Sequence, residues 1–342
     1  MKSVKNFIAI AVLFYSSTAY TQMLVSLHSN GAVQHFSGAN ALINAYTAAV
    51  TGDTIYLPGG SFVPPANFDK GLTIYGAGHY QDSTQATGKS FIAGTVTMNE
   101  NADHFHMEGI EILGSFIISN NAAVNQLTLK YCKINVTFNV MGNLSNPSNN
   151  LALIGNVFIG DVTLSNATNV SIYNSMLQGH FVNSVGNQIY NCIFLFPGGG
   201  GDPMINGEMV NNNLYNNVFL QTGWAIYSTI TGNTYKYNLF VSSAPNLGPG
   251  AVSENNYFGI AQSSIFIAQS GSSFDYTHNY HLQAPFTYPG SDGLQVGMYG
   301  GIFPYKEGAV PSNPHIRVKT ISPTTDGSGN LHVNIQVAAQ NN

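Results

Sequence analysis

A short motif recurs about every twenty residues through the middle of the chain, and it limits the possible folds more than any other feature. Each copy has the order apolar, variable, Asn/Tyr/Gly, Asn/Cys/Ser, apolar, large apolar. Short β-type runs at such a period are typical of a solenoid whose turns stack like rungs. The copies are HMEGIEIL (106–113), TLKYCKIN (128–135), ALIGNVFI (152–159), SIYNSMLQ (171–178), QIYNCIFL (188–195), NLYNNVFL (213–220), TYKYNLFV (234–241) and VSENNYFG (252–259).

Aligning the copies predicts columns of residues that stack between neighbouring rungs, which lie ~4.8 Å apart. One column contains mostly Asn, Cys and Ser, and the large apolar residues two positions after it would fill the core. Stacked Asn side chains in that column can hydrogen-bond to each other and to the backbone, whereas a β-sandwich would not show a fixed column of Asn. We call it the ladder column; it contains Ile110, Cys132, Asn156, Ser175, Cys192, Asn217, Asn238 and Asn256, spaced by 22, 24, 19, 17, 25, 21 and 18 residues.

The segment before the repeats predicts a helix that caps the first rung, because a solenoid exposes its core at each end. SGANALINAYTAAVTGD (37–53) has helical periodicity, with Ser37 as a plausible N-cap and Gly52 as a plausible stop. The segments 53–60 and 71–79 are predicted to be the opening strands. The expected buried face of the helix consists of Leu42, Ala45, Tyr46, Ala49 and Val50.

At two places the chain resembles right-handed parallel β-helix proteins of the pectin-lyase-like superfamily. AAVTGDTIYLPGGSF followed by GLTIYGAGH (48–62 and 71–79) is similar to the start of such proteins. NYHLQAPFTYPGSDGLQVGMYGG (279–301) resembles the closing rung of secreted β-helix proteins from Bacteroidetes-type bacteria. The resemblance covers residues 37–303. It implies a right-handed parallel β-helix. With the N-terminal capping helix and a short C-terminal β-hairpin, both predicted from the sequence pattern, the expected fold class is all-β.

The superfamily includes polysaccharide lyases, polygalacturonase-like hydrolases and non-catalytic proteins, so the resemblance does not by itself select an activity.

The sequence pattern changes after the predicted β-helix, in residues 304–342. Three prolines mark a linker. HIRVKTI (315–321) and LHVNIQV (331–337) alternate in polarity and are predicted to form a β-hairpin. This hairpin is too short to stand alone and could pack on the last rungs.

The first 21 residues predict a secretory signal peptide. Lys2 and Lys5 provide the positive charge, and FIAIAVLFY (7–15) is a short apolar run followed by small residues for cleavage. This run is too short to span a bilayer, which needs ~20 residues, and no later run is long enough. We therefore expect a bacterial protein that is secreted or held at the cell surface, with residues 22–36 leading into the β-helix.

The composition narrows the choice of partners. Hydrophobic residues make up 44% of the chain, which is enough for a large core. Charged residues make up only 7%, and the formal net charge is -5. This composition argues against nucleic acid as a partner, because its binding needs many contacts from Lys and Arg to phosphates. We expect a monomer.

The alternative function is a polysaccharide lyase or a related glycan-active enzyme acting on uronate-containing polymers. Its base would be Lys236 or a tyrosine such as Tyr237, and Ca²⁺ could neutralise the uronate of a lyase substrate. Lys130 shares a column with Lys236, but five rungs, or ~24 Å, separate them. No catalytic constellation and no other cofactor is evident. The acidic residues that could bind calcium are scattered singly: Asp161, Asp202, Glu208 and Glu254.

Asp202 and Glu208 could also form the carboxylate pair of a glycosidase. Both lie in an inserted loop, FPGGGGDPMINGEM (196–209), and a solvated loop is the more ordinary interpretation.

Histidines are the remaining candidates for chemistry. Alternation along a strand would place His104 and His106 on one face, where two histidines can hold a metal. No third ligand is obvious, so we predict no metal site. His278 and His281 lie in the predicted closing rung, where a structural role is expected.

The most suggestive feature is a column of tyrosines two positions before the ladder column. If this column faces outward, three tyrosines stack on consecutive rungs. Aromatic faces with a polar tip suit sugar rings, although tyrosine is also favoured in strands, where stacked pairs stabilise sheets. The leading hypothesis is a protein that binds polysaccharide or acts structurally at the cell surface. The candidate glycan-binding residues, which we call the stripe, are Tyr173, Tyr190, Tyr215, Lys236 and Glu254.

The two cysteines of the chain, Cys132 and Cys192, both fall in the ladder column. Three rungs separate them by ~14 Å. A disulfide needs Cα atoms within ~7 Å, so both are predicted to be unpaired.

Overall fold

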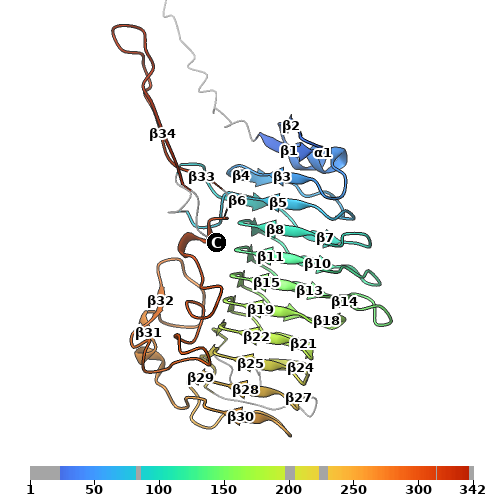
Figure 1. Ribbon diagram of the computed structural model, residues 1–342, viewed down its shortest axis with the longest axis vertical. Helices are drawn as coiled ribbons and strands as arrows, with labels where there is room; N and C mark the ends of the chain where they lie inside the picture. Colours follow the sequence, from blue (N-terminus) through green and yellow to red (C-terminus); the bar gives the residue numbers. More distant parts are fainter. Residues whose placement is uncertain (1–23, 82–85, 197–204, 223–229, 313, 339–342) are drawn as a thin grey trace, which may run out of the picture.

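The chain folds into a right-handed parallel β-solenoid of about nine turns, which confirms the fold class predicted from the repeat (Figure 1). The predicted signal peptide, residues 1–21, lies outside the described residues. Within the described part of the chain, no helix is long and apolar enough to cross a membrane. The computed structural model describes residues 24–81, 86–196, 205–222, 230–312 and 314–338.

Three sheets form the sides of the solenoid, and we call them the first, second and third sheets. The first sheet contains, in spatial order, β2 (Ala32–Phe36), β1 (Val25–Ser29), β3 (Thr54–Tyr56), β5 (Thr73–Tyr75), β8 (His106–Glu108), β11 (Thr128–Lys130), β15 (Ala152–Ile154), β19 (Ser171–Tyr173), β22 (Gln188–Tyr190), β25 (Asn213–Tyr215), β28 (Thr234–Lys236) and β30 (Val252–Glu254).

The other two sheets are built from shorter strands. The second sheet contains β4 (Gly60–Phe62), β6 (Ser90–Ile92), β9 (Glu111–Ile112), β12 (Lys133–Ile134), β16 (Val157–Phe158), β20 (Met176–Leu177), β23 (Ile193–Phe194), β26 (Val218–Phe219) and β29 (Leu239–Phe240). The third sheet contains β7 (Val96–Met98), β10 (Phe116–Ile118), β13 (Phe138–Val140), β17 (Val162–Thr163), β21 (Phe181–Val185), β24 (Ile205–Val210) and β27 (Ile230–Thr231). Smaller elements are the pairs β14 (Ser148–Asn149) with β18 (Ala167–Thr168) and β31 (Phe266–Ala268) with β32 (Asn279–Leu282), and the 3-10 turns Gln262–Ser264 and Glu307–Ala309.

Each copy of the motif ends its first-sheet strand at one residue in the left-handed conformation, and in all copies but the last this corner leads into a strand of the second sheet. In the copy that begins with β22, this residue is Asn191, with a φ of 55°. Asn and Gly adopt this conformation more readily than other residues, which explains their frequency at this position. The next residue, Cys192, is then fully buried at the corner. We call the left-handed positions the corner column: Gly109, Tyr131, Gly155, Asn174, Asn191, Asn216, Tyr237 and Asn255.

The ladder column satisfies backbone groups at these buried corners. Asn217 accepts the backbone N–H of Cys192 through Oδ1 at 2.8 Å. Its Nδ2 donates to the carbonyl oxygen of Ile189 at 2.8 Å and to Oδ1 of Asn238 at 3.1 Å. Where serine stands in the column, the Ser175 hydroxyl oxygen accepts the N–H of the preceding ladder residue at 3.0 Å. Each asparagine and serine of the column therefore supplies a hydrogen bond that water cannot supply inside the solenoid.

A second asparagine ladder lies at the corner between the third and first sheets. Asn187, Asn212 and Asn233 are fully buried there. Asn212 donates its backbone N–H to Oδ1 of Asn233 at 2.9 Å, and Asn187 does the same to Asn212 at 2.9 Å. The motif alignment missed this ladder, although an Asn directly precedes three of its copies in the sequence.

The N-terminal end is capped by α1 (Ala41–Ala48) and by a β-hairpin formed from the lead-in. β1 pairs antiparallel with β3, so residues 25–36 extend the first sheet. The helix is shorter than predicted: its N-cap position is Asn40 rather than Ser37. Val50 is 54% exposed and not on the buried face, because the helix has already ended at this point. The other predicted face residues are buried: Leu42, Ala45, Tyr46 and Ala49.

Residues 257–312, which we call the return segment, run back along the outside of the second sheet toward the first rungs (Figure 1). Asn174 donates through Nδ2 to the carbonyl oxygens of Met298 and Gly300, at 2.9 and 2.6 Å. The prediction that 279–301 closes the solenoid as a rung is therefore wrong, since this stretch lies beside the stack. It covers outward-facing apolar residues of the second sheet, which are buried beneath it: Val157, Met176, Ile193, Val218 and Leu239.

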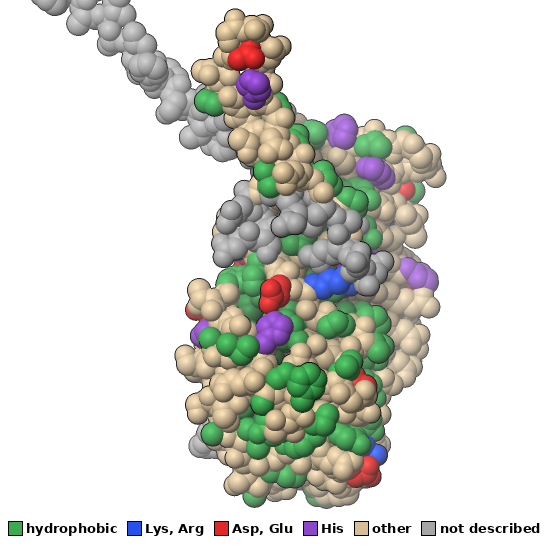
Figure 2. All heavy atoms as spheres, turned by 60° about the vertical axis from the view of Figure 1, so that its left-hand side comes forward, with side chains coloured by type: hydrophobic (Ala, Val, Ile, Leu, Met, Phe, Trp, Pro, Cys, Tyr) green, Lys and Arg blue, Asp and Glu red, His purple; other side chains and the backbone are tan. Residues whose placement is uncertain are grey.

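Figure 2 shows the face that carries the return segment; hydrophobic side chains are spread over it and charged ones are few.

The C-terminal hairpin, β33 (His315–Ile321) with β34 (Val333–Ala338), forms as predicted but at the other end of the molecule. Ile316 lines a cavity together with Tyr56 and Tyr75, which belong to the opening strands. The expectation that the hairpin packs on the last rungs is therefore wrong, because the return segment has already carried the chain back to the start. Figure 1 shows the hairpin pointing away from the solenoid.

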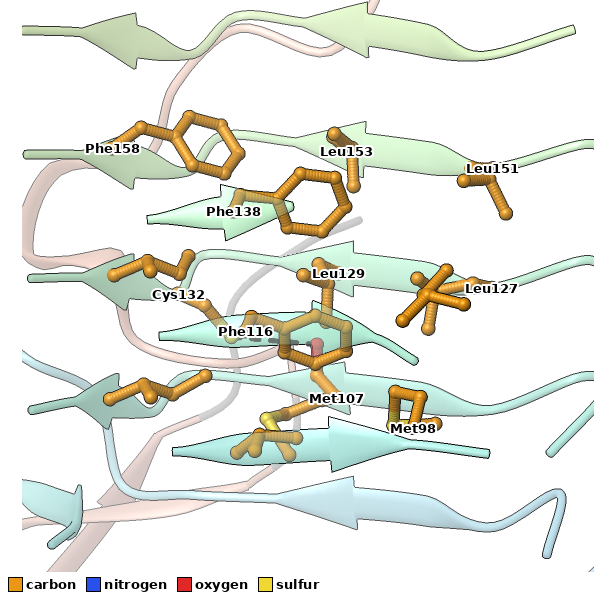
Figure 3. Packing of buried hydrophobic residues seen from close by; sticks show 14 of the residues in the cluster. Met98, Met107, Phe116, Leu127, Leu129, Cys132, Phe138, Leu151, Leu153 and Phe158 are labelled. Atoms are coloured by element: carbon orange, nitrogen blue, oxygen red, sulfur yellow. Dashed lines mark hydrogen bonds between the residues drawn. The ribbon is translucent and has the colours of Figure 1, made fainter. Parts of the chain in front are cut away.

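The core is filled by apolar side chains stacked from rung to rung. Figure 3 shows the rings of Phe116 and Phe138, which stack with their centroids 5.5 Å apart and are fully buried. Phe194, Phe219 and Phe240 continue this pattern in the second sheet, at 4.6 and 4.8 Å. Because a ring on one rung contacts rings above and below, the core is continuous along the axis.

Both cysteines are unpaired and fully buried. Burial raises the pKa of the Cys132 and Cys192 thiols to about 12. The thiolate is the reactive form, so we expect the folded protein to react negligibly with a thiol reagent such as DTNB at neutral pH. After unfolding in guanidinium without reductant, two thiols per chain should titrate. Fewer than two would reveal a disulfide and contradict the ladder geometry.

Candidate functional site

The outward face of the first sheet carries the stripe. Tyr173, Tyr190 and Tyr215 lie directly opposite one another on β19, β22 and β25. Lys236 and Glu254 continue the same register on β28 and β30. All three tyrosines are partly exposed. The structure therefore brings the five predicted residues together in one straight column.

The rings of the stripe do not lie flat on the sheet. Tyr190 and Tyr215 are nearly parallel, with an interplanar angle of 13° and centroids 5.1 Å apart. Two parallel rings this close cannot share one plane, so their faces are turned toward each other along the solenoid axis. The stripe therefore presents ring edges and hydroxyls to the solvent. The expectation that it offers open aromatic faces to sugar rings is wrong for this pair.

The far end of the stripe is an ion pair. Nζ of Lys236 lies 2.7 Å from the Glu254 carboxylate and 6.0 Å from the centroid of the Tyr215 ring. The hydrogen bond to Glu254 raises the pKa of Lys236. A lysine held in its protonated form is a poor general base. Lys236 is thus placed to donate hydrogen bonds rather than to accept a proton.

Toward the first rungs the same column is closed by the return segment. Glu108 is 1% exposed and accepts hydrogen bonds from the N–H and hydroxyl of Ser312, at 2.8 and 3.1 Å. His106 lies 3.2 Å from its other oxygen, and Lys130 lies 3.9 Å away. Burial alone would raise the pKa of Glu108, but these partners outweigh it and lower the pKa. Glu108 therefore fastens the return segment and is not open to a ligand, and Lys130 lies beside it as its counter-charge.

Three aromatic residues on this face were missed by the motif alignment. Tyr56 and Tyr75 occupy the column on the opening strands, stacked 5.6 Å apart, and line a cavity of about 270 Å³. Both belong to a TIY triplet, a signal that could have extended the alignment. Phe303 of the return segment packs on Tyr173 at 5.7 Å, and no local sequence pattern indicates this contact.

A buried ion network on the second sheet also escaped the sequence. Glu111 is 4% exposed and contacts Lys89 at 2.9 Å, Lys133 at 3.1 Å and Nδ2 of Asn135 at 3.0 Å. Burial would raise the pKa of Glu111, but the hydrogen bond from Lys89 and the other contacts lower it. The signal was present, since Glu111 and Lys133 hold the same position in successive copies of the motif.

The histidines and acidic residues considered for chemistry do not assemble a metal site in the described ranges, where no group of three or more His, Cys, Asp or Glu is close enough to hold an ion. His104 sits in a left-handed turn with a φ of 62°, which breaks the alternation expected with His106. Asp202 lies outside the described residues. Glu208 is exposed on β24.

His278 and His281 lie in the return segment. His278 contacts the Tyr280 hydroxyl at 3.2 Å, and His281 contacts Glu307 at 3.0 Å.

Comparison of the chain with protein-family models, with curated proteins and with solved structures gives no match.

Proposed function

We propose that the protein binds a polysaccharide chain along the outward face of the first sheet. The observation that carries the proposal is the straight column of Tyr173, Tyr190 and Tyr215, which repeats a phenol at each rung. The rung spacing of ~4.8 Å is close to the length of one sugar residue in an extended chain. Successive sugars could therefore meet equivalent hydroxyls, with Lys236 and Glu254 at one end of the row.

The neighbouring outward column supports this orientation. Ser171, Gln188, Asn213 and Thr234 lie in register two positions before the stripe. Their hydroxyl and amide groups both donate and accept hydrogen bonds, as sugar hydroxyls do. A chain lying along the solenoid axis would contact both columns at once. The predicted signal peptide, 1–21, and the resemblance to pectin-lyase-like proteins support a place outside the bacterial cell, where such polymers occur.

The proposal does not extend to lyase activity. Lys236, one base that the sequence offers, is tied to Glu254 with its pKa raised. Tyr237, the other, lies in the corner column and not in the stripe. Binding without bond cleavage is the function that this geometry favours.

Replacing both Tyr190 and Tyr215 by Phe tests the proposal, because it keeps the stacked rings and removes the hydroxyls. Affinity gel electrophoresis with glucan, xylan, pectin and alginate identifies the polymers that retard the wild-type protein, which we call responsive. We expect the double variant to bind a responsive polymer about tenfold more weakly, or weaker still. Phe286→Ala is the matched control, since this aromatic side chain is 94% exposed on the return segment. Unchanged retention of the double Phe variant on every responsive polymer would refute the proposal.

A further inference from the structure

A cavity of about 270 Å³ lies where the return segment meets the first rungs, away from the stripe. Its volume is near the lower end of the ~300–1,000 Å³ range of ligand pockets, so it suits one small ring rather than a chain. The lining includes four tyrosines and two other titratable side chains: Tyr80, Tyr276, Tyr280, Tyr299, His278 and Glu307.

The walls of this cavity are held in place by ring contacts. Tyr80 meets Tyr276 edge to face, with centroids 4.5 Å apart. The ring of His281 stacks on Tyr299 at 3.7 Å, and its Nε2 lies 3.0 Å from the Glu307 carboxylate. A ligand would therefore meet groups that are already oriented, which reduces the entropy that binding costs.

One wall supplies a hydrogen-bond donor. His79 is fully buried behind it, with Nδ1 3.1 Å from the hydroxyl oxygen of Tyr276. In the described part of the chain, Nε2 of His79 has no hydrogen-bond partner. A buried N–H without a partner is rarer than a bare acceptor, so the proton is assigned to Nδ1 and is donated to Tyr276. The hydroxyl proton of Tyr276 then remains available to a ligand.

The charges around the cavity exclude several ligand classes. Glu307 in the wall disfavours an anion. The ammonium groups of Lys89 and Lys133 lie 5.5 and 4.9 Å from the centroid of Tyr276. The single carboxylate of Glu111 offsets only one of these two charges, and the remaining positive charge disfavours an organic cation. A purely apolar ligand would leave the hydroxyl proton of Tyr276 without an acceptor. What fits is a neutral ring that carries several hydroxyls.

We propose that this cavity binds a single neutral sugar ring, at a site separate from the stripe. Tyrosine rings contact the apolar parts of the sugar, while the hydroxyl of Tyr276 donates to it and Glu307 accepts from its hydroxyls. The site does not depend on polysaccharide binding by the first sheet, and each can fail without the other.

Isothermal titration calorimetry with the methyl glycosides of glucose, galactose, mannose and xylose tests this site directly. We expect at least one of them to bind, and Tyr299→Ala and Glu307→Gln each to weaken that binding about tenfold or more. Tyr190→Ala is the matched control and should leave the affinity unchanged, because Tyr190 belongs to the stripe. Glu307 is exposed, so its variant should fold even if Tyr299→Ala does not.

Three results would overturn the proposal: no glycoside binds the wild-type protein, tetramethylammonium binds more tightly than every glycoside, or Glu307→Gln binds as well as the wild type. Loss of polymer retention in the stripe variants, by contrast, leaves the cavity site untouched, so the two proposals are distinguished by their variants.

Discussion

Replacing Asn217 by Ala is expected to lower the free energy of unfolding by about 3–5 kcal/mol. The substitution removes the acceptor of the Cys192 N–H and the donor to the Ile189 carbonyl, at a corner that is fully buried. An orphaned buried polar group costs about 1–3 kcal/mol, and the lost side chain leaves a small cavity. Urea unfolding followed by circular dichroism measures the change.

Two further variants separate the hydrogen bonds from a general effect of losing asparagine. Asn213→Ala changes the same rung on its outward side and should cost less than about 0.5 kcal/mol. Asn217→Ser should recover part of the loss, because Ser175 performs the same acceptor role in the ladder column. Equal costs for Asn217→Ala and Asn213→Ala would show that the ladder does not stabilise the corners.

The protein should lose stability as the pH falls below 6.5, because of His79. Burial, with help from Lys133 and Lys89 and against the effect of Glu111, lowers the pKa of His79 to about 3. The unfolded chain binds a proton at this residue near pH 6.5, whereas the folded protein does so only near pH 3. Between these values, each pH unit removes about 1.4 kcal/mol, so stability near pH 4.5 should be about 2.5 kcal/mol lower than at pH 7.

The matched variant is His79→Gln, which cannot titrate. Its free energy of unfolding should lack this part of the pH dependence, and the difference between the two slopes isolates His79 from the other histidines. Measurements above about pH 4.5 avoid the region where Glu108 and Glu111, whose pKa values are lowered, also begin to lose their contribution. Parallel pH profiles for the two proteins would mean that His79 becomes protonated in the folded state.

The repeated rungs could be predicted from the sequence because each one solves the same local problem. Every copy has a left-handed corner, followed in most copies by a hydrogen-bonding residue, and Asn supplies both at Asn216 and Asn217. Aligning such positions sets the register of the strands, and with it the straight column of Tyr173, Tyr190 and Tyr215. The direction in which the rings face depends on packing between side chains. The spacing of the motif copies in the sequence does not determine that packing.

The return segment could not be predicted in the same way. Beyond residue 259 it contains no copy of the motif, and its contacts join residues far apart in the chain, such as Asn174 and Met298, 124 residues apart. The outward apolar residues of the second sheet did signal that something must cover them. Glu108 and Glu111 look like ordinary charged strand residues in the sequence, because the segments that bury them follow much later in the chain.

The bond between Ser312 and Glu108 spans 204 residues, and it changes the order in which the molecule can be completed. In a plain solenoid each rung contacts only its neighbours, so rungs can be added as the chain emerges from the ribosome. Here the carboxylate of Glu108 has only its neighbours His106 and Lys130 as partners until Ser312 arrives, when about nine tenths of the chain has been made. Contacts of such long range slow folding. The side of the first rungs that carries Glu108 therefore stays uncovered through most of the synthesis of the chain.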